Sequence, residues 1–360
     1  MSGCPRISIR GGGFRFARGA GHEAGRVHRG CHNAGMTNSA EVTWQLDGIT
    51  MYGTIARPGG DGQFPAVVLV AGSGPTDRDW CSPLLPGTNG SGRLLAEAFA
   101  AAGIASLRYD KRASGPHAVQ NVTKLIGRMS MQSHLDELVA AVGVLATQDL
   151  VDASRIVGLG NSEGTLHVLH YATSAQDVPF AGIVLAAPPG RAVGEVVLSQ
   201  LALQAAQVPG GTELMPAVRA AAGRYQAGQP MDLDPRLPDS VKMVLASFEV
   251  PANLPLAREL WAEDAAGSLP KVKIPALVLI GMKDLQVDVH ADGEPLQEAA
   301  AGMANVTFAF PPNANHVFKE DTRGAAEAAG APGTGYNEPG TRLDPESLQT
   351  ILAWLRGVLT

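Results

Sequence analysis

The chain has 360 residues, 45% hydrophobic and 17% charged, so it can bury a sizeable core and has an ordinary globular composition. Its net charge of −6, with no basic run through the body of the chain, argues against a nucleic-acid or anionic-membrane partner. No apolar stretch reaches the roughly 18 residues that a membrane span requires.

Residues 1–35 differ from the rest of the chain. Six arginines stand against one acid, Glu23, with Gly-rich spacing and no apolar periodicity. This composition predicts a disordered segment. A targeting peptide is the alternative, but the apolar core of a secretory signal is missing. A foreign tail, or a start codon placed too early with Met36 as the true start, fits better.

Three cysteines, Cys4, Cys31 and Cys81, cannot all pair and show no metal-ligand spacing. The simplest interpretation is a reducing compartment, so we expect a cytoplasmic protein.

The chain from residue 42 to residue 190 alternates between strand and helix patterns. Residues 42–56 predict a hairpin around Asp47-Gly48. The apolar runs 64–71, 104–109 and 181–187 are typical of strands buried in a parallel sheet, and helical periodicity appears between them. The fold class predicted is therefore α/β, with a doubly wound, mostly parallel sheet and right-handed crossovers.

A sharp turn lies at the centre of this pattern. The buried strand of residues 155–159 passes through Gly160-Asn161-Ser162-Glu163-Gly164 into an apolar helix. Glycines are needed two residues before and after Ser162, because a direct strand-to-helix reversal brings backbone close on both sides. The Gly-x-Ser-x-Gly motif resembles the nucleophile elbow of the α/β-hydrolase family. The resemblance implies an α/β-hydrolase fold with Ser162 as the nucleophile.

The loop after the 64–71 strand, Ala-Gly-Ser-Gly-Pro-Thr-Asp-Arg-Asp, also resembles this family, in a bacterial esterase branch. Glycines at this place allow backbone N–H groups to point into a cleft. By position, the resemblance implies an oxyanion hole formed by the N–H groups of Ser73 and Glu163, with Gly74 as a substitute for Ser73. A Gly-rich turn that binds nothing is the alternative.

The run Leu-Arg-Tyr-Asp-Lys-Arg at residues 107–112 resembles the family as well. For Arg108, Asp110 and Arg112 we expect a structural salt-bridge cluster beneath the elbow rather than a catalytic role. His134, near the start of the helix that follows, is expected to be a solvated or capping histidine.

Residues 191–269 interrupt the alternation, since they are rich in Ala, Leu, Gln and Val and contain no β-branched run. This pattern predicts a helical cap inserted into a hydrolase core of residues 36–190 and 270–360. Its large apolar side chains line the pocket or form the cap's own core, and the sequence does not choose between these roles: Met215, Tyr225, Met243, Phe248 and Trp261.

The strand pattern returns at residues 272–281 and ends in Asp284, in a Gly-x-x-Asp-x-x-Val form that matches the acid loop of the family. His316 follows the last strand, residues 306–310, and completes the chain order Ser, Asp, His. The predicted triad is therefore Ser162, Asp284 and His316. Asp288, Asp292 and His290 are the rivals.

The function expected from the resemblance is a serine hydrolase that cleaves carboxylic esters of small to medium acyl chain, with no cofactor and no metal. A serine aminopeptidase or an acyl-thioesterase on the same triad is the alternative. A peptidase should offer a carboxylate to the substrate amine, and four candidates exist: Glu163, Glu259, Glu263 and Asp264. A non-catalytic ligand-binding protein is the alternative of another class. The expected partner is a small-molecule ester, and the chain is expected to be a monomer or homodimer.

Overall fold

The computed structural model describes residues 26–28 and 38–360. Most of the segment predicted to be disordered, residues 1–35, therefore lies outside the described residues. Three residues of that segment, Arg26–His28, form a short strand (β1) that pairs antiparallel with the edge of the sheet.

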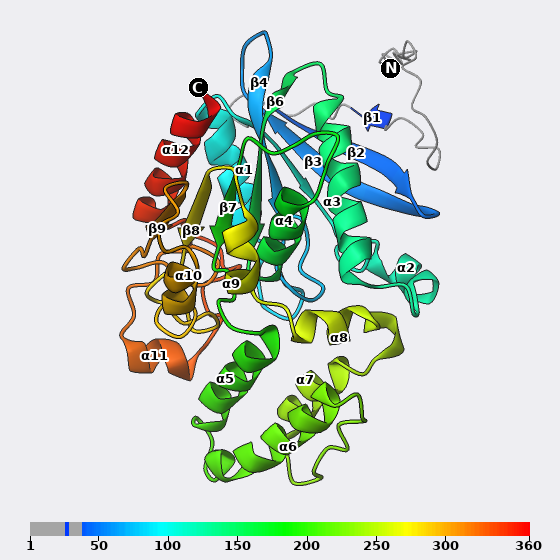
Figure 1. The fold of residues 1–360 in the computed structure, drawn as a ribbon, viewed down its shortest axis with the longest axis vertical. Helices are drawn as coiled ribbons and strands as arrows, with labels where there is room; N and C mark the ends of the chain where they lie inside the picture. The colour runs from blue at the N-terminus through cyan, green and yellow to red at the C-terminus, as the bar shows by residue number, and fades with distance from the viewer. Residues whose placement is uncertain (1–25, 29–37) are drawn as a thin grey trace.

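The described strands form one sheet in the order β1-β2-β3-β5-β4-β6-β7-β8-β9 (Figure 1). Pairing is antiparallel from β1 to β5 and parallel from β5 through β4 to β9, as a mostly parallel sheet requires. The predicted fold class is confirmed. The remaining strands are β2 (Asn38–Leu46), β3 (Ile49–Arg57), β4 (Phe64–Val70), β5 (Ala105–Tyr109), β6 (Val151–Asn161), β7 (Gly182–Ala186), β8 (Ala276–Leu279) and β9 (Val306–Ala309).

The predicted hairpin is β2–β3. Its two turn residues, Asp47 and Gly48, have φ values of 53° and 75°. Two successive positive φ values match the twist of the flanking strands, which is why an Asp-Gly pair stands here.

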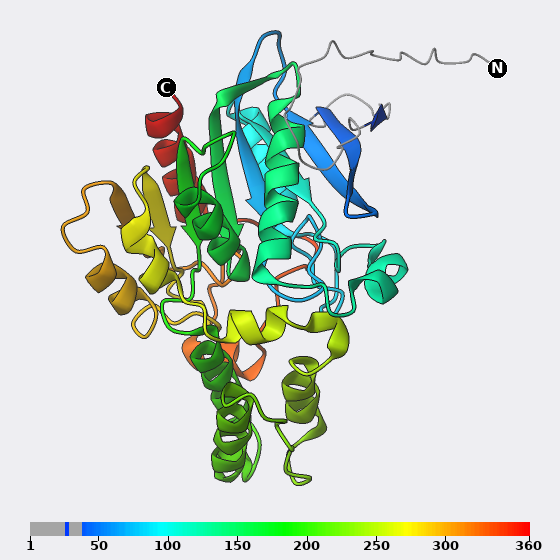
Figure 2. The same cartoon turned by 45° about the vertical axis from the view of Figure 1, so that its right-hand side comes forward.

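Helices cover both faces of the sheet. Figures 1 and 2 show α3 (Met131–Ala146) and α4 (Glu163–Thr173) on one face, and α1 (Ser91–Ala101) and α12 (Pro345–Leu359) on the other. Local sequence explains where two of them begin. Ser130 and Ser133 form a reciprocal capping box at α3, and Asp344 accepts the Ser347 N–H at the start of α12.

Between β7 and β8 the chain leaves the carboxyl edge of the sheet and forms a helical segment, residues 191–269. Its first helices project from one end of the sheet in both views (Figures 1 and 2). They enclose a separate apolar cluster that includes Leu201, Tyr225, Leu245 and Trp261. The segment contains α5 (Val193–Ala205), α6 (Met215–Gln226), α7 (Asp239–Ser247), α8 (Leu256–Trp261), α9 (Ala265–Ser268) and three short 3-10 turns, Gly211–Leu214, Pro251–Asn253 and Leu269–Lys271.

The end of the helical segment belongs to the main core. Leu256, Leu260, Ala265 and Leu269 are buried among the residues that cover the sheet. Three short helices complete the fold: α2 (Ala118–Leu125), α10 (Gly293–Ala299) and α11 (Ala325–Gly330).

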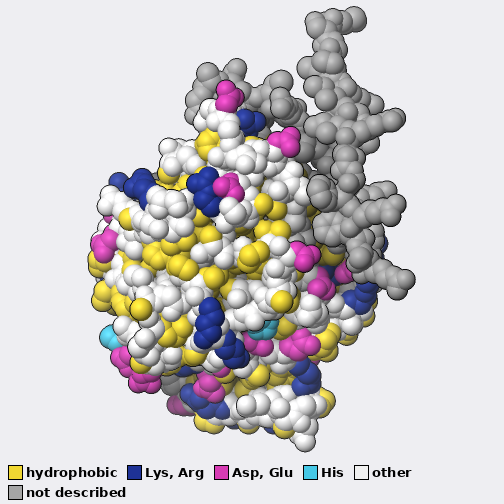
Figure 3. All heavy atoms as spheres, turned by 45° about the horizontal axis from the view of Figure 1, so that its top comes forward, with side chains coloured by type: hydrophobic (Ala, Val, Ile, Leu, Met, Phe, Trp, Pro, Cys, Tyr) yellow, Lys and Arg dark blue, Asp and Glu magenta, His cyan; other side chains and the backbone are white. Residues whose placement is uncertain are grey.

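No helix in the described part of the chain is long and apolar enough to cross a membrane. On the face shown in Figure 3, Lys and Arg side chains lie interspersed with Asp and Glu side chains.

Candidate active site

Ser162 lies at the junction of β6 and α4, in a backbone conformation that few residues adopt. Its φ of 54° and ψ of −123° are strained for a residue with a Cβ atom. The backbone around it is closely packed. A Cβ on Gly164 would lie 2.5 Å from the Val70 carbonyl oxygen, and a Cβ on Gly160 would collide with the Gly164 carbonyl. Both glycines are thus required by close backbone approach.

Asp284 and His316 form a buried hydrogen-bonded pair at the same edge of the sheet. Asp284 follows β8, and its Oδ2 lies 2.8 Å from Nδ1 of His316, which follows β9. The other carboxylate oxygen accepts the N–H groups of Gln286 at 2.7 Å and Val287 at 3.0 Å. Because the aspartate is fixed by its own loop, it holds the imidazole with the proton on Nδ1 and leaves Nε2 free to accept one.

A hydrogen bond connects the loop that carries His316 to the turn that carries Ser162. Asn161, the residue before Ser162, donates from its buried side-chain amide to the His316 backbone carbonyl at 3.0 Å. The structure therefore brings together the carboxyl ends of β6, β8 and β9, although more than a hundred residues separate β6 from β8 in the sequence. Tyr336 packs on the same histidine, with ring centroids 6.5 Å apart.

The Gly-rich loop after β4 lies against the nucleophile. A Cβ added to Gly72 would lie 3.3 Å from Cβ of Ser162, so the two chain segments are in contact. Within the described part of the chain, the N–H groups of Ser73 and Glu163 donate to no other residue. Gly74, at φ 70°, turns the loop back after Ser73. Two unpaired N–H groups beside a candidate nucleophile are what an oxyanion site would offer.

Ion pairs hold this loop to β5 and the turn after it. Asp110 accepts from Arg78 through the backbone N–H at 2.8 Å and the guanidinium at 2.8 Å and 3.0 Å. Arg108 donates to Asp79 at 2.5 Å. These residues form ion pairs that position the loop, in line with the structural role expected for the charged run.

A second layer of charge is buried directly beneath the elbow. Lys111 donates to the Gly72 carbonyl at 2.6 Å and to Oε1 of Glu163 at 3.0 Å. His167, one turn along α4, lies 3.2 Å from the same Oε1. Burial alone would raise the pKa of the Glu163 carboxyl, but the Lys111 ammonium and the His167 hydrogen bond hold that pKa below its usual range. Burial lowers the pKa of His167 to about 4.

His134 differs from the expectation of a solvated or capping residue. It is 3% exposed, because α3 presents it to α4, where its ring meets that of His167 edge-on at 4.7 Å. Its Nδ1 lies 3.2 Å from Glu137, which Arg112 also contacts at 2.5 Å. Burial would raise the pKa of Glu137, but His134 and Arg112 lower it overall.

Three of these groups could in principle hold a metal ion. Donor atoms of His134, Glu163 and His167 all lie within 4.8 Å of one another. The Lys111 ammonium, however, already contacts the carboxylate that such an ion would need. A divalent cation at this place would lie beside a buried positive charge, which is unfavourable.

The rival acid and base candidates are engaged elsewhere. Asp292 is fully buried and pairs with Arg191 at 2.9 Å. Asp288 accepts the backbone N–H groups of its own turn, including that of His290. The His290 side chain is 79% exposed and lies 3.2 Å from Glu294. Asp284 is thus the described carboxylate that contacts His316.

Residues that the motifs did not reveal connect the site to the helical segment. Gln200 on α5 donates to the Gln286 carbonyl at 3.3 Å, and the Gln286 side chain donates to the Tyr336 hydroxyl at 3.2 Å. Burial raises the pKa of Tyr336 well above its usual range, so its hydroxyl stays neutral. The aromatic ring beside His316 is that of Tyr336, within residues 319–342. The Gly/Ala-rich composition of this stretch did not indicate that one of its side chains lies at the site.

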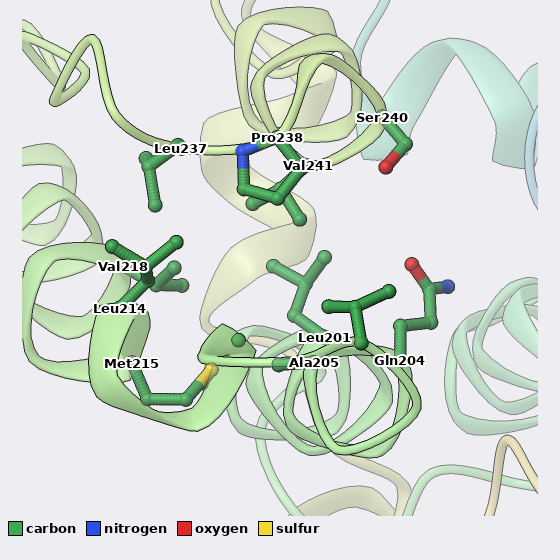
Figure 4. A pocket seen from close by; sticks show the side chains of 12 residues that line it. Leu201, Gln204, Ala205, Leu214, Met215, Val218, Leu237, Pro238, Ser240 and Val241 are labelled. Carbon is green, nitrogen blue, oxygen red and sulfur yellow. The ribbon is translucent and has the colours of Figure 1, made fainter.

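A small pocket lies within the helical segment itself, away from any motif. Figure 4 shows apolar side chains of α5, α6 and the 237–241 stretch facing one another, with the polar ends of Gln204 and Ser240 on the same side. Its lining therefore combines an apolar interior with two neutral hydrogen-bonding groups.

Comparisons with known proteins place this geometry in context. Esterase EstD of Thermotoga maritima is 29% identical over 267 residues, which cover 74% of this chain but only 57% of that protein. The chain thus spans little more than half the length of this curated relative. The solved structure of an esterase from Pyrococcus furiosus, at 16% identity and a TM-score of 0.51, is covered over 92% of its length and 90% of this chain.

Another solved structure, the alpha/beta hydrolase GrgF from a Penicillium species, has 17% identity and a TM-score of 0.51, with 89% of this chain and 99% of that chain covered. At such low identities, these two likenesses bear on the fold alone. The family comparison goes further, because the model of the alpha/beta hydrolase family matches residues 67–328, which is most of the chain. With the strand order, the strained serine turn and this match together, the chain belongs to the alpha/beta hydrolase family.

Proposed function

We propose that the protein is a carboxylesterase-type serine hydrolase that cleaves esters of small to medium acyl chain through an acyl-enzyme on Ser162. The observation that carries this proposal is the 2.8 Å contact between Asp284 and His316, on a loop that Asn161 ties to the strained serine turn. The likeness to an esterase, EstD, supports ester hydrolysis as the reaction class.

In the proposed mechanism, His316 accepts the Ser162 hydroxyl proton as the oxygen attacks the ester carbonyl. Asp284 holds the imidazole in the required tautomer and stabilises the imidazolium. The N–H groups of Ser73 and Glu163, with Gly74 as a substitute for Ser73, receive the negative oxygen, each contributing about 3 kcal/mol. His316 then protonates the leaving alcohol and activates a water molecule that releases the acid.

Residues 191–269 are proposed to act as the cap of this site, over a core of residues 36–190 and 270–360. The segment leaves the carboxyl edge of β7, and Gln200 contacts the acid loop that carries Asp284. Such a position suits a role in shaping the acyl or alcohol pocket rather than in the bond cleavage itself.

Carboxylate contacts favour the esterase over the aminopeptidase. Glu163 is paired with Lys111, and Glu263 lies 3.1 Å from His170. Glu259 accepts the Met131 N–H at 2.7 Å, and Asp264 caps α9. Each of the four carboxylates considered for a substrate amine already has a partner, so binding an ammonium group would require breaking an existing contact.

The experiment is hydrolysis of p-nitrophenyl acetate, butyrate and octanoate by the wild type and by Ser162→Ala, with an aminoacyl p-nitroanilide in parallel. We expect kcat on the esters to fall by about four to six orders of magnitude in the variant. The anilide should be cleaved far more slowly than the esters by the wild type.

The control is the melting temperature of both proteins, which should agree because the substitution removes one oxygen atom. Equal ester turnover by the two proteins would refute the mechanism. Preferred cleavage of the anilide would instead replace the esterase with the peptidase.

A further inference from the structure

Lys111 occupies an unusual place for a lysine. Its side chain is 5% exposed and reaches from the end of β5 to the underside of the elbow. The ammonium donates to two acceptors only, the Gly72 carbonyl at 2.6 Å and Glu163 Oε1 at 3.0 Å, within the described part of the chain. These acceptors belong to the two segments that border Ser162.

The first contact fixes the direction of a particular N–H group. Gly72 C=O and Ser73 N–H belong to the same peptide unit, which is planar and trans, so they point in opposite directions. An ammonium bound to the carbonyl from beneath therefore turns the Ser73 N–H away from it. Hydrogen bonds also polarise one another along a chain, so the same contact strengthens Ser73 as a donor.

The second contact holds the other side of the site. Glu163 begins α4, and its side chain is clamped between Lys111 and His167. The residue is 7% exposed and cannot rotate away without breaking an ion pair in the interior. Its backbone N–H, which starts the helix beside Ser162, is held in place through that side chain.

We propose that Lys111 is a positioning residue that aligns both N–H donors of the oxyanion hole, Ser73 through the Gly72 carbonyl and Glu163 through its carboxylate. This inference rests on the proposed esterase function and adds a residue that the motifs did not select. Lys111 does not touch the substrate. It acts through the peptide unit of residues 72–73 and through the first residue of α4.

The rival explanation is that Lys111 only neutralises a buried carboxylate. A matched pair of double variants separates the two. Lys111→Met with Glu163→Gln removes one buried ion pair together with the contact to Gly72. Arg112→Met with Glu137→Gln removes a neighbouring buried ion pair, in which Nε of Arg112 lies 2.5 Å from Oε1 of Glu137. This pair has no contact with Gly72.

The four proteins to compare are the wild type, the two double variants and Ser162→Ala, all assayed with p-nitrophenyl acetate. For the Lys111/Glu163 double variant we expect kcat to fall about 10- to 100-fold with KM nearly unchanged, since outright removal of an oxyanion donor costs about 10²- to 10³-fold. The Arg112/Glu137 double variant should keep its kcat within about threefold of the wild type.

A second readout follows the oxyanion hole directly. A trifluoromethyl ketone forms a hemiketal with the serine, and its negative oxygen occupies the oxyanion position. The affinity of the ketone should fall by the same factor as kcat in the Lys111/Glu163 double variant. In the Arg112/Glu137 double variant this affinity should stay close to that of the wild type. Glu163→Gln alone keeps the contact to Gly72 and should lose less than the double variant. Where the double variant does not fold, Lys111→Gln with Glu163→Gln replaces it, because the shorter amide cannot bridge both acceptors.

Equal kcat and equal inhibitor affinity in the two double variants, with Ser162→Ala inactive, would overturn the role of Lys111 and leave the esterase standing. Full activity in Ser162→Ala would overturn both.

Discussion

Two regions of this molecule are held together by different forces. Beneath the elbow, ion pairs are buried almost completely, with Lys111 on Glu163 and Arg112 on Glu137. In the helical segment the buried cluster consists of apolar and aromatic side chains, and the ring of Trp261 meets those of Tyr225 and Phe248 at centroid distances of 5.1 Å and 5.0 Å.

The difference has a physical consequence. A buried ion pair with hydrogen bonds has a narrow permitted geometry and is costly to break, so it fixes atoms in place. Apolar packing is less directional and tolerates exchanges that keep volume. The first arrangement suits a site that must hold a transition state. The second suits the proposed role of residues 191–269, which is to shape a pocket that selects among acyl groups.

The largest expected effect comes from removing the aromatic centre of the helical segment. Trp261 is 6% exposed, and Trp261→Ala should lower the free energy of unfolding by about 3–5 kcal/mol. Because no charged contact of the elbow depends on it, KM and acyl-chain preference should change much more than the rate at which a small fluorophosphonate labels Ser162. Steady-state kinetics across acyl lengths and a labelling time course measure the two quantities.

Met243→Ala is the control for that substitution, since Met243 lies in the same segment and is 71% exposed. It should change the free energy of unfolding by less than about 0.5 kcal/mol. A Trp261→Ala protein that loses labelling by fluorophosphonate would show that the two regions are not separable.

The same substitution, glycine to alanine, can be made in each of the two regions to compare them. A Cβ on Gly164 would lie 2.5 Å and 2.7 Å from the carbonyl oxygens of Val70 and Ala71, so Gly164→Ala must displace backbone. We expect a loss of about 1–3 kcal/mol in unfolding free energy. Displacing Ser162, the proposed nucleophile, should also lower kcat/KM at least about 100-fold.

Gly223→Ala is the counterpart in the helical segment. Gly223 lies inside α6 with nothing within 4 Å of the added Cβ, so the substitution should stabilise the protein by about 0.5–1 kcal/mol. Urea unfolding and ester turnover of both variants provide the test. Tolerance of Ala at position 164 with full activity would contradict the packing argument at the elbow.

The same contrast explains what the sequence alone could predict. Ser162 and Asp284 follow the buried strands β6 and β8, and His316 follows the edge strand β9. The glycines around Ser162 are required by close backbone contacts that are local in sequence. Parallel strands bring such residues to one edge, so the fold class and the candidate triad followed from local patterns. The Asp284–His316 contact is what this geometry produces.

Contacts between distant segments could not be predicted in this way. The sequence predicts a solvated or capping role for His134, because nothing in its own helix shows that α4 covers it. Lys111 belongs to the charged run of residues 107–112, but its contacts to Gly72 and Glu163 arise only when β5, the Gly-rich loop and α4 pack together. In the helical segment, apolar composition did not separate buried Tyr225 from exposed Met243.

The last prediction concerns pH and His167, which lies between Glu163 and His134 in the buried layer of charge beneath the elbow. The pKa of His167 is about 4 in the folded protein, below the usual value near 6.5, because burial disfavours its charged form. Between these two values the unfolded chain binds a proton that the folded chain does not bind. Stability therefore falls as pH falls through this window, by about 2 kcal/mol between pH 7 and pH 5.

His167→Gln tests this contribution, because the amide can still donate to Glu163 but does not titrate. Urea unfolding of wild type and variant at pH 7 and pH 5 gives the free energies, and the wild type should lose about 2 kcal/mol more than the variant over this interval. Glu163 does not interfere, since the low pKa of its carboxyl confines its own loss of stability to pH values below the usual glutamate range near 4.5. An equal loss in both proteins would show that His167 is as easily protonated in the folded state as in the unfolded one, and that the charge layer beneath the elbow is wetter than its burial indicates.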